Sequence, residues 1–173
     1  MPRPRYPFQP RSNRYLVPGQ FWAIELADGR FGCGRVLEVD PQNRVRFLAG
    51  LMDWCGNAQP TPESIAGSSL AELGKAHIKT IAHTGGAILG HRPLEADGVA
   101  LPEVLDAWHG GHVVRGFTAL RRASAIDEAS LPVLGAWGYD YIRVLAARRC
   151  MARAKCNGQS VVLHQDHNRA VQP

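Results

Sequence analysis

The clearest pattern along the chain is an alternation of apolar and polar residues near the N-terminal end, which predicts β-strands. Trp22, Ile24 and Leu26 stand at every second position, separated by smaller or charged residues. A period of two is typical of a strand that has one face in a core. The pattern continues over 30–39 and 44–47. The sequence therefore predicts a three-stranded antiparallel meander.

The turns of this meander carry signals of their own. Asp28-Gly29 is a dipeptide favoured in a two-residue type I′ turn, in which both central residues need a positive φ. Residues 40–43, Asp-Pro-Gln-Asn, predict the second turn. Gly32 and Gly34, inside the second strand, indicate a bulge, a coil or a close approach of the backbone.

The middle of the chain predicts a helix followed by a strand. Thr61 can cap this helix, Pro62 suits its first position, and Gly74 suits the position just beyond its end. A strand is expected at 76–82, and a glycine-rich stretch, 84–90, comes next.

The C-terminal half predicts two further helices with a strand between them. A short helix is expected from Pro102 to the glycines at 110 and 111, and its buried side would be Val104, Leu105 and Trp108. A strand is expected over 112–120 and a last helix over 139–153. One stripe of that helix is apolar and should face the core: Tyr141, Ile142, Val144 and Leu145.

Together these elements predict one α+β domain, with the antiparallel meander at its N-terminal end and a few helices packed on the sheet. The chain has 173 residues, 45% of them hydrophobic, which is enough for a single core. We expect a flexible basic arm at 1–14, the domain at 15–156 and a tail at 157–173, in which 160–164 could add a short strand. A run of about 20 apolar residues is absent, so no membrane-spanning segment is expected.

Charge is divided unevenly along the chain. The net charge is +5, yet residues 15–142 hold ten basic and fourteen acidic residues, so both ends are strongly basic. Basic ends could bind nucleic acid or an anionic surface. The C-terminal basic residues are not interleaved with aromatic ones, which favours the other interpretation, solvated arginine-rich ends.

Residues that could carry catalysis or hold a metal form no recognised pattern. Five of the seven histidines lie between 77 and 112, but no HExxH, HxH or HxHxDH spacing occurs. A GxSxG elbow, an SxxK pair and a papain-like cysteine signature are also absent from the sequence. The sequence therefore predicts neither an enzyme nor a bound metal or cofactor. The cysteines form no CxxC pair and are expected as reduced thiols: Cys33, Cys55, Cys150 and Cys156.

A distinctive hairpin pattern runs from Val17 to Leu37, where the chain is VPGQFWAIELADGRFGCGRVL. This pattern resembles the opening of the immunity protein 26 family. Residues 131–133 and 137–139, which lead into a predicted helix, are similar to the C-terminal portion of that family. The resemblance covers about 15–147. The residues that carry its pattern are Trp22, Asp28, Gly29, Gly34, Trp137 and Gly138.

The resemblance implies an immunity protein of a bacterial polymorphic-toxin system. Such a protein acts in the cytoplasm, where it binds a cognate toxin and neutralises it by occlusion, without catalysis. The mildly acidic body would suit a basic toxin, such as a nuclease domain. Two other classes stay open: a metal-dependent hydrolase similar to phosphotriesterases, and a nucleic-acid-binding module that uses the basic ends.

Acidic and aromatic residues in the predicted loops and the short helix are the candidates for toxin contact. Carboxylates would supply the field that speeds encounter, and tryptophans would anchor the interface. The other interpretation is an ordinary solvated acidic face, with the tryptophans in the core. The candidates are Asp53, Trp54, Glu95, Asp97, Glu103, Asp106 and Trp108.

Overall fold

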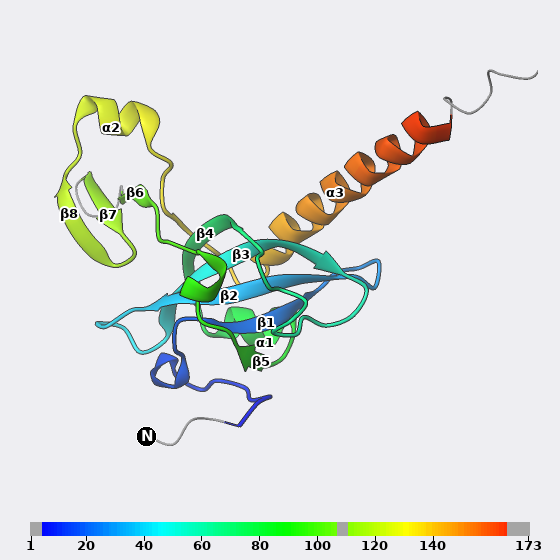
Figure 1. Ribbon diagram of the computed structural model, residues 1–173. Coiled ribbons are helices and arrows are strands. Elements are labelled where there is room, and N and C mark those ends of the chain that lie inside the picture. The colour runs from blue at the N-terminus through cyan, green and yellow to red at the C-terminus, as the bar shows by residue number, and fades with distance from the viewer. Residues whose placement is uncertain (1–4, 107–110, 166–173) are drawn as a thin grey trace, which may run out of the picture.

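The structure is a computed structural model that describes residues 5–106 and 111–165, with side chains as far as Lys155. Over these residues the chain forms one α+β domain, as expected, with nine strands in two sheets and three α-helices. Figure 1 shows the two sheets next to each other and helix α3 extending away from the larger one. None of the described helices is long and apolar enough to cross a membrane.

The larger sheet forms the centre of the domain. Its six strands lie in the order β5-β1-β2-β3-β4-β9, and every pair is antiparallel except β4 with β9. The strands are β1 (Gln20–Glu25), β2 (Phe31–Val39), β3 (Arg46–Gly56), β4 (Leu70–His77), β5 (Ile88–His91) and β9 (Gly135–Ala136).

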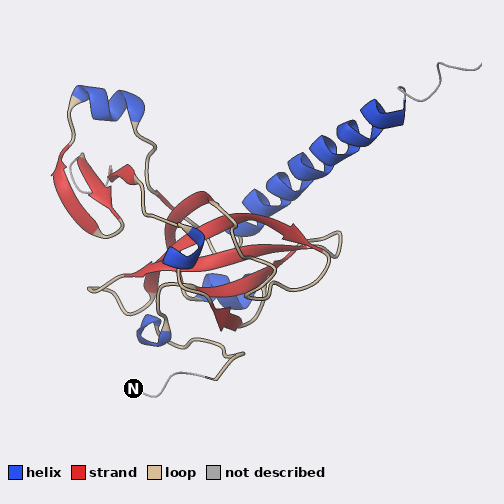
Figure 2. Ribbon diagram, in the orientation of Figure 1, coloured by secondary structure: helices blue, strands red, loops and turns tan. Residues whose placement is uncertain are grey.

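A smaller sheet and short helices complete the domain. The smaller sheet is an antiparallel meander of β6 (Glu103–Asp106), β7 (His112–Arg115) and β8 (Thr118–Arg122). The helices are α1 (Lys79–Thr84), α2 (Ala125–Ser130) and α3 (Tyr141–Gln165), with 3-10 turns η1 (Asn13–Tyr15) and η2 (Glu95–Asp97). In Figure 2 the smaller sheet and α2 lie at the left of the larger sheet, and α3 leaves it at the right.

The predicted N-terminal meander is confirmed, but its first turn differs from the expectation. Strands β1, β2 and β3 pair antiparallel in sequence order. The N–H of Leu26 donates to the carbonyl of Arg30 and that of Gly29 to the carbonyl of Leu26, which closes a three-residue loop. Gly29 has φ 81°, whereas no described residue other than glycine has a positive φ. A type I′ turn needs a positive φ at Asp28 as well, so that part of the prediction is wrong.

The glycines of β2 produce both a bulge and close packing, as their positions indicated. The register of β2 against β3 shifts between Gly32 and Gly34. A Cβ on Gly34 would lie 2.3 Å from the ring of Trp22, and one on Gly32 would lie 2.9 Å from the Cβ of Ala146 in α3. Because Trp22 and Ala146 are both buried, neither can move aside without disturbing the core.

The helix predicted to begin at Thr61 is absent, although its cap forms. The hydroxyl of Thr61 accepts the N–H of Ser64, as a helix cap would, but the turns end at Gly67, which has φ 72°. From Leu70 onward the chain pairs with β3 as strand β4. Long-range pairing therefore overrides the local helix signals, and Gly74 lies inside a strand and not beyond a helix.

Other predicted elements are also corrected. The strand expected at 76–82 is the end of β4 followed by α1, and the short helix expected from Pro102 is strand β6. Residues 112–120 form a hairpin and not one strand, because the chain turns at Gly116, with φ 61°. The last helix is confirmed but extends to Gln165, so 160–164 is helical and adds no strand.

Two buried clusters connect these layers. The first joins the larger sheet to α1 and α3. Within α3, Ile142 and Leu145 belong to it as expected, whereas Tyr141 and Val144 are exposed. The second cluster joins the two sheets and consists of Leu37, Leu48, Leu94, Val104, Val114 and Leu134.

A disulfide joins Cys55 at the end of β3 to Cys150 of α3, with their Cα atoms 5.7 Å apart. The expectation of reduced thiols is wrong for this pair. The sequence did not indicate this disulfide, because 95 residues separate the two cysteines and only the packing of α3 on β3 brings them together. Cys33 is free and buried, and desolvation raises the pKa of its thiol to about 12, so it serves as a small apolar residue.

Residues 5–14, which belong to the flexible arm expected at 1–14, contact the domain at several places, through Phe8 and Asn13 among others. Phe8 forms a β-bridge with Ile88 of β5. The buried side-chain amide of Asn13 lies against the β2–β3 turn, where its nitrogen donates to the carbonyls of Asn43 at 2.5 Å and Arg46 at 2.7 Å. This segment therefore fastens a turn of the meander.

Replacing Asn13 with alanine should lower the free energy of unfolding by about 1–3 kcal/mol, because carbonyls of the turn lose a buried donor. Urea denaturation of the variant checks this expectation. Arg14→Ala is the matched control, since Arg14 is exposed in the same 3-10 turn and should change stability by less than about 0.5 kcal/mol. Equal stability of Asn13→Ala and the parent protein would contradict an anchoring role for the segment.

Candidate functional site

The acidic candidates for toxin contact are mostly engaged in ion pairs within the domain. Asp53 of β3 accepts from Arg149 of α3 at 3.2 Å and lies 3.2 Å from Arg153. Glu103 of β6 pairs with Arg115 at 2.9 Å and lies 3.7 Å from Arg121. Asp106, at the end of β6, is buried and pairs with Lys75 of β4 at 2.6 Å.

Asp97 is the most deeply engaged of these acids. Its side chain is 0% exposed and lies between Arg35, at 2.8 Å, and Arg92, at 2.8 Å. The N–H of Gly67 also donates to it at 2.8 Å. Desolvation alone would raise the pKa of Asp97, but these hydrogen bonds together hold it below its usual value. Asp97 is therefore a structural residue that connects η2 to β2.

The remaining candidates are divided between surface and core. Glu95 in η2 is exposed. Trp54 is partly buried against Met52 and Ile65, so it belongs to the packing of β3. Trp108 lies outside the described residues.

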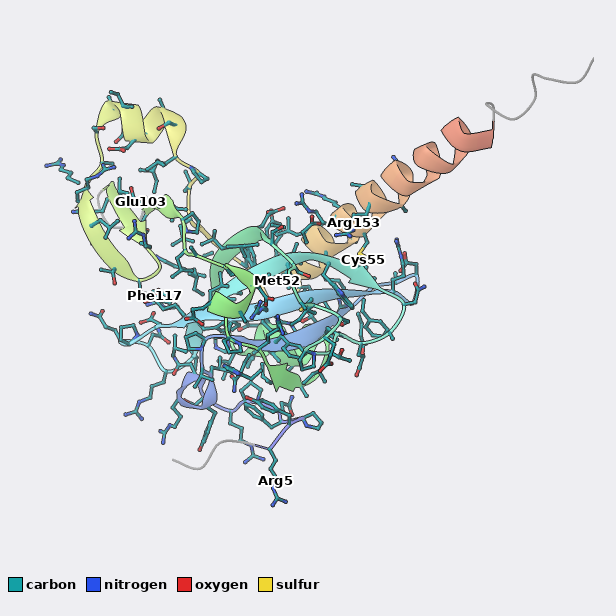
Figure 3. The ribbon with its side chains drawn as sticks, in the orientation of Figure 1. Arg5, Met52, Cys55, Glu103, Phe117 and Arg153 are labelled. Atoms are coloured by element: carbon teal, nitrogen blue, oxygen red, sulfur yellow. A yellow bond between two sulfur atoms is a disulfide. The ribbon has the colours of Figure 1, made fainter. Side chains whose placement is uncertain are left out.

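The candidate acids do not form one acidic surface. Arg153 of α3 pairs with Asp53 and so marks its position. Figure 3 shows Arg153 well away from Glu103, which lies on the smaller sheet. Because most of these carboxylates already face arginine or lysine, their fields are largely cancelled at short range. The acidic field expected from the sequence is therefore not presented by these residues as a group.

Aromatic and cationic side chains gather instead where α1 meets the start of α3. Tyr139 lies with its ring centroid 5.4 Å from that of His77 and 5.1 Å from that of His83. The ammonium of Lys79 is 5.9 Å from the same ring, within reach of a cation–π interaction. We call this surface the aromatic patch and define it as His77, Lys79, His83, Trp137, Tyr139 and Tyr141.

The position of Trp137 fixes one side of the aromatic patch. Its ring covers Gly74 of β4, where a Cβ would lie 2.3 Å from the indole, and its backbone N–H donates to the carbonyl of Lys75. The ring of Tyr141 follows at 6.2 Å. Trp137 is half-buried, whereas Tyr139 and Tyr141 are exposed. Trp137 thus fixes the base beside Tyr141, whereas Tyr139 lies beside His77 and His83.

Polar contacts hold α1 against α3 beneath the aromatic patch. The guanidinium of Arg143 donates to the carbonyl of His83 and lies 3.5 Å from Asp140. The N–H of Lys79 donates to Nδ1 of His77 at 3.0 Å, which leaves Nε2 of the neutral ring as its donor. Desolvation, and then the charge of Lys79, lower the pKa of His77, so its ring is neutral at pH 7.

The sequence contains a signal for this surface in the spacing of its aromatic residues. Three of the eight tryptophan and tyrosine residues of the chain fall within 137–141.

Trp137 and Gly138 were expected only as part of a structural motif. A Cβ on Gly138 would meet no atom of the described residues within 4 Å, and the carbonyl of Gly138 accepts the first N–H of α3. The remaining motif residues, Trp22, Asp28, Gly29 and Gly34, all serve the first hairpin and its core.

Among the described residues, no three histidine, cysteine, aspartate or glutamate side chains gather as a set that could hold a metal ion.

Comparison with known proteins identifies no relative: no family model matches the chain, and neither a curated protein nor a solved structure matches it. The aromatic patch is therefore the surface on which a functional proposal can be based.

Proposed function

We propose that this chain is an immunity protein that binds a cognate toxin and occludes it, with the aromatic patch at the centre of the interface. The observation that carries the proposal is the exposure of two tyrosines, Tyr139 beside His77 and His83, and Tyr141 beside Trp137. Tyrosine, tryptophan and arginine are the residues that most often dominate binding energy at protein interfaces. The resemblance of the first hairpin to immunity protein 26 supports the same class.

The charge of the aromatic patch indicates the chemistry of the partner surface. Lys79 and Arg143 are cationic, and Asp140 lies beside Arg143 at 3.5 Å. Complementarity therefore favours acidic side chains on the contacted part of the toxin. This differs from the basic toxin expected from the net charge of residues 15–142, because the acids of that region are largely paired within the domain.

A cytoplasmic location belongs to this proposal, since an immunity protein must meet its toxin where the toxin would act on its own cell. The disulfide between Cys55 and Cys150 is the observation that bears against it. Disulfides persist in oxidising compartments and are rare in a reducing cytoplasm. The proposal of toxin binding holds in either compartment.

The experiment is co-purification with the product of the adjacent gene, followed by rescue of cells that express this product. The double variant Tyr139→Ala/Tyr141→Ala should weaken binding by about 30-fold or more and abolish rescue, as expected for central aromatic anchors. Tyr15→Ala is the matched control, because Tyr15 is 45% exposed and Tyr141 is 46% exposed. It should bind and rescue like the parent protein.

Two results would contradict the proposal. If the product of the adjacent gene does not bind the folded parent protein, that product is not a toxin that this chain neutralises. If the double variant binds as tightly as Tyr15→Ala does, the aromatic patch does not belong to the interface.

A further inference from the structure

A pocket of about 450 Å³ lies between the two sheets, and Arg46 in its wall is paired across β3 and β4 with His77 of the aromatic patch. Its walls come from the β2–β3 turn and β3 (Asp40, Arg46), from β4 (Lys75), and from the smaller sheet, where Val114 and Phe117 contribute. Ligand pockets typically span about 300–1,000 Å³ and combine apolar walls with a few fixed polar groups. The size and the mixed lining fit that description.

The walls of the pocket are held in place from both sheets. Glu38 of β2 accepts the N–H of Phe117 at 2.9 Å, which fastens the β7–β8 turn to the larger sheet. Gly116 is required in that turn, because it has φ 61° and a Cβ would lie 1.5 Å from the carboxylate of Glu38. The ion pair of Lys75 with Asp106 connects the sheets at a second point. The pocket is therefore preformed.

In the wall of the pocket, the carboxylate of Asp40 is used by groups of the domain, whereas Arg46 and Lys75 keep donors available for a ligand. The buried Asp40 carboxylate accepts the N–H groups of Gln42 at 2.8 Å and Asn43 at 3.1 Å, and it also pairs with Arg46. Arg46 uses only Nε in that pair, so its two terminal amino groups have no partner among the described residues. Lys75 likewise uses one of its three donors on a side chain, Asp106.

The other wall is apolar. Phe117 is half-buried in the cluster that joins the two sheets, and Val114 and Pro41 line the pocket beside it. A ligand that suits this arrangement has an anionic group for the donors and a flat or branched apolar body for Phe117.

We propose that this pocket binds a small organic carboxylate, whose oxygens accept from Arg46 and Lys75 and whose apolar body packs on Phe117 and Val114. The proposal does not rest on toxin binding: the pocket adjoins the aromatic patch through Arg46 and His77, but the two share no residue, and benzoate binding is measured on the chain alone. The carboxylate oxygens would replace solvent on donors that the protein leaves available, at little cost to the existing ion pairs.

The test is a titration of the full chain with benzoate, followed by ¹H–¹⁵N NMR. We expect saturable shifts centred on Arg46, Lys75 and the 115–119 turn. Benzamide, the neutral isostere, should bind at least about tenfold more weakly, because it lacks a charge-assisted hydrogen bond. Inorganic phosphate is the third probe, and its failure to compete would show that the apolar wall contributes.

Arg46→Gln removes the guanidinium charge while leaving the hydrogen bonds from Gln42 and Asn43 to Asp40 in place, and it should weaken benzoate binding about tenfold or more. Arg44→Gln is the matched control, because Arg44 is exposed on the same turn and does not line the pocket. The NMR spectra also establish that both variants are folded. Absence of saturation by benzoate, equal binding of benzamide, or equal losses from Arg44→Gln and Arg46→Gln would each overturn the proposal.

Discussion

Replacing Asp97 with alanine should lower the free energy of unfolding by about 3–5 kcal/mol, because it removes one partner of a buried ion pair. Arg35 and Asp97 are both 0% exposed in their side chains. Without Asp97 the guanidinium of Arg35 would keep only its contacts to the carbonyls of Arg92 and Pro93. Its Nε already has no partner in the described structure, so the loss would leave a charge poorly compensated.

Urea denaturation at pH 7 measures this effect. Glu95→Ala is the matched control, because Glu95 is exposed in the same 3-10 turn, and it should change stability by less than about 0.5 kcal/mol. Equal stability of the two variants would show that the Arg35–Asp97–Arg92 group does not hold the domain together.

The same residue predicts a dependence on pH. The pKa of Asp97 lies below its usual value of 3.8 in the folded protein. The ionised form therefore stabilises the fold above that value, and the contribution is lost as the pH falls through the lowered pKa. The stability difference between the parent protein and Asp97→Asn should be full at pH 7 and should shrink below about pH 4. A difference that is constant over this range would contradict the assignment.

Removing the disulfide should also have a large effect. The bond between Cys55 and Cys150 closes a loop over 95 residues of sequence separation. The chain-entropy account gives a loss of about 4.7 kcal/mol for a loop of this length, equivalent to a decrease in Tm of about 10–20 °C. α3 would then be held by its buried face and by the pairs of Arg149 and Arg153 with Asp53.

Thermal denaturation of the double variant Cys55→Ser/Cys150→Ser checks this expectation. Reductant provides the control within one experiment, since it should lower the Tm of the parent protein and leave that of the double variant unchanged. An unchanged Tm of the parent protein in reductant would contradict a stabilising disulfide.

The N-terminal meander could be predicted from the sequence because its information is local. Alternation at Trp22, Ile24 and Leu26 is enough to predict a strand, although β1 is buried on both faces and not on one, since Phe21 and Ala23 are buried as well. The glycines of β2 were informative for the same reason, since a residue without a side chain indicates crowding around its backbone.

The errors arose where long-range pairing competes with local signals. Thr61 does form a cap, yet the following segment becomes β4 because β3 offers a complete partner strand. The segment after Pro102 has apolar residues that suit a helix, but Val104 and Leu105 pair with β7, and Val104 packs between the sheets. A single sequence shows the preference of each segment and not the partner that overrides it.

The candidate site was less predictable than the fold. The acidic residues were identified by type and by predicted exposure, but ion pairing depends on neighbours distant in sequence, such as Arg149 for Asp53. The aromatic patch likewise joins β4 and α1 to residues 137–141, which lie far along the chain from both elements. Only the concentration of aromatic residues at 137–141 was visible in advance.

Hydrogen exchange of the chain alone and in complex with the product of the adjacent gene tests the central claim most directly. We predict that the complex slows exchange at 77–84 and 137–145, the two segments that form the aromatic patch, and leaves the smaller sheet unchanged. Protection confined to 112–122, or no change in exchange at any segment, would contradict the account.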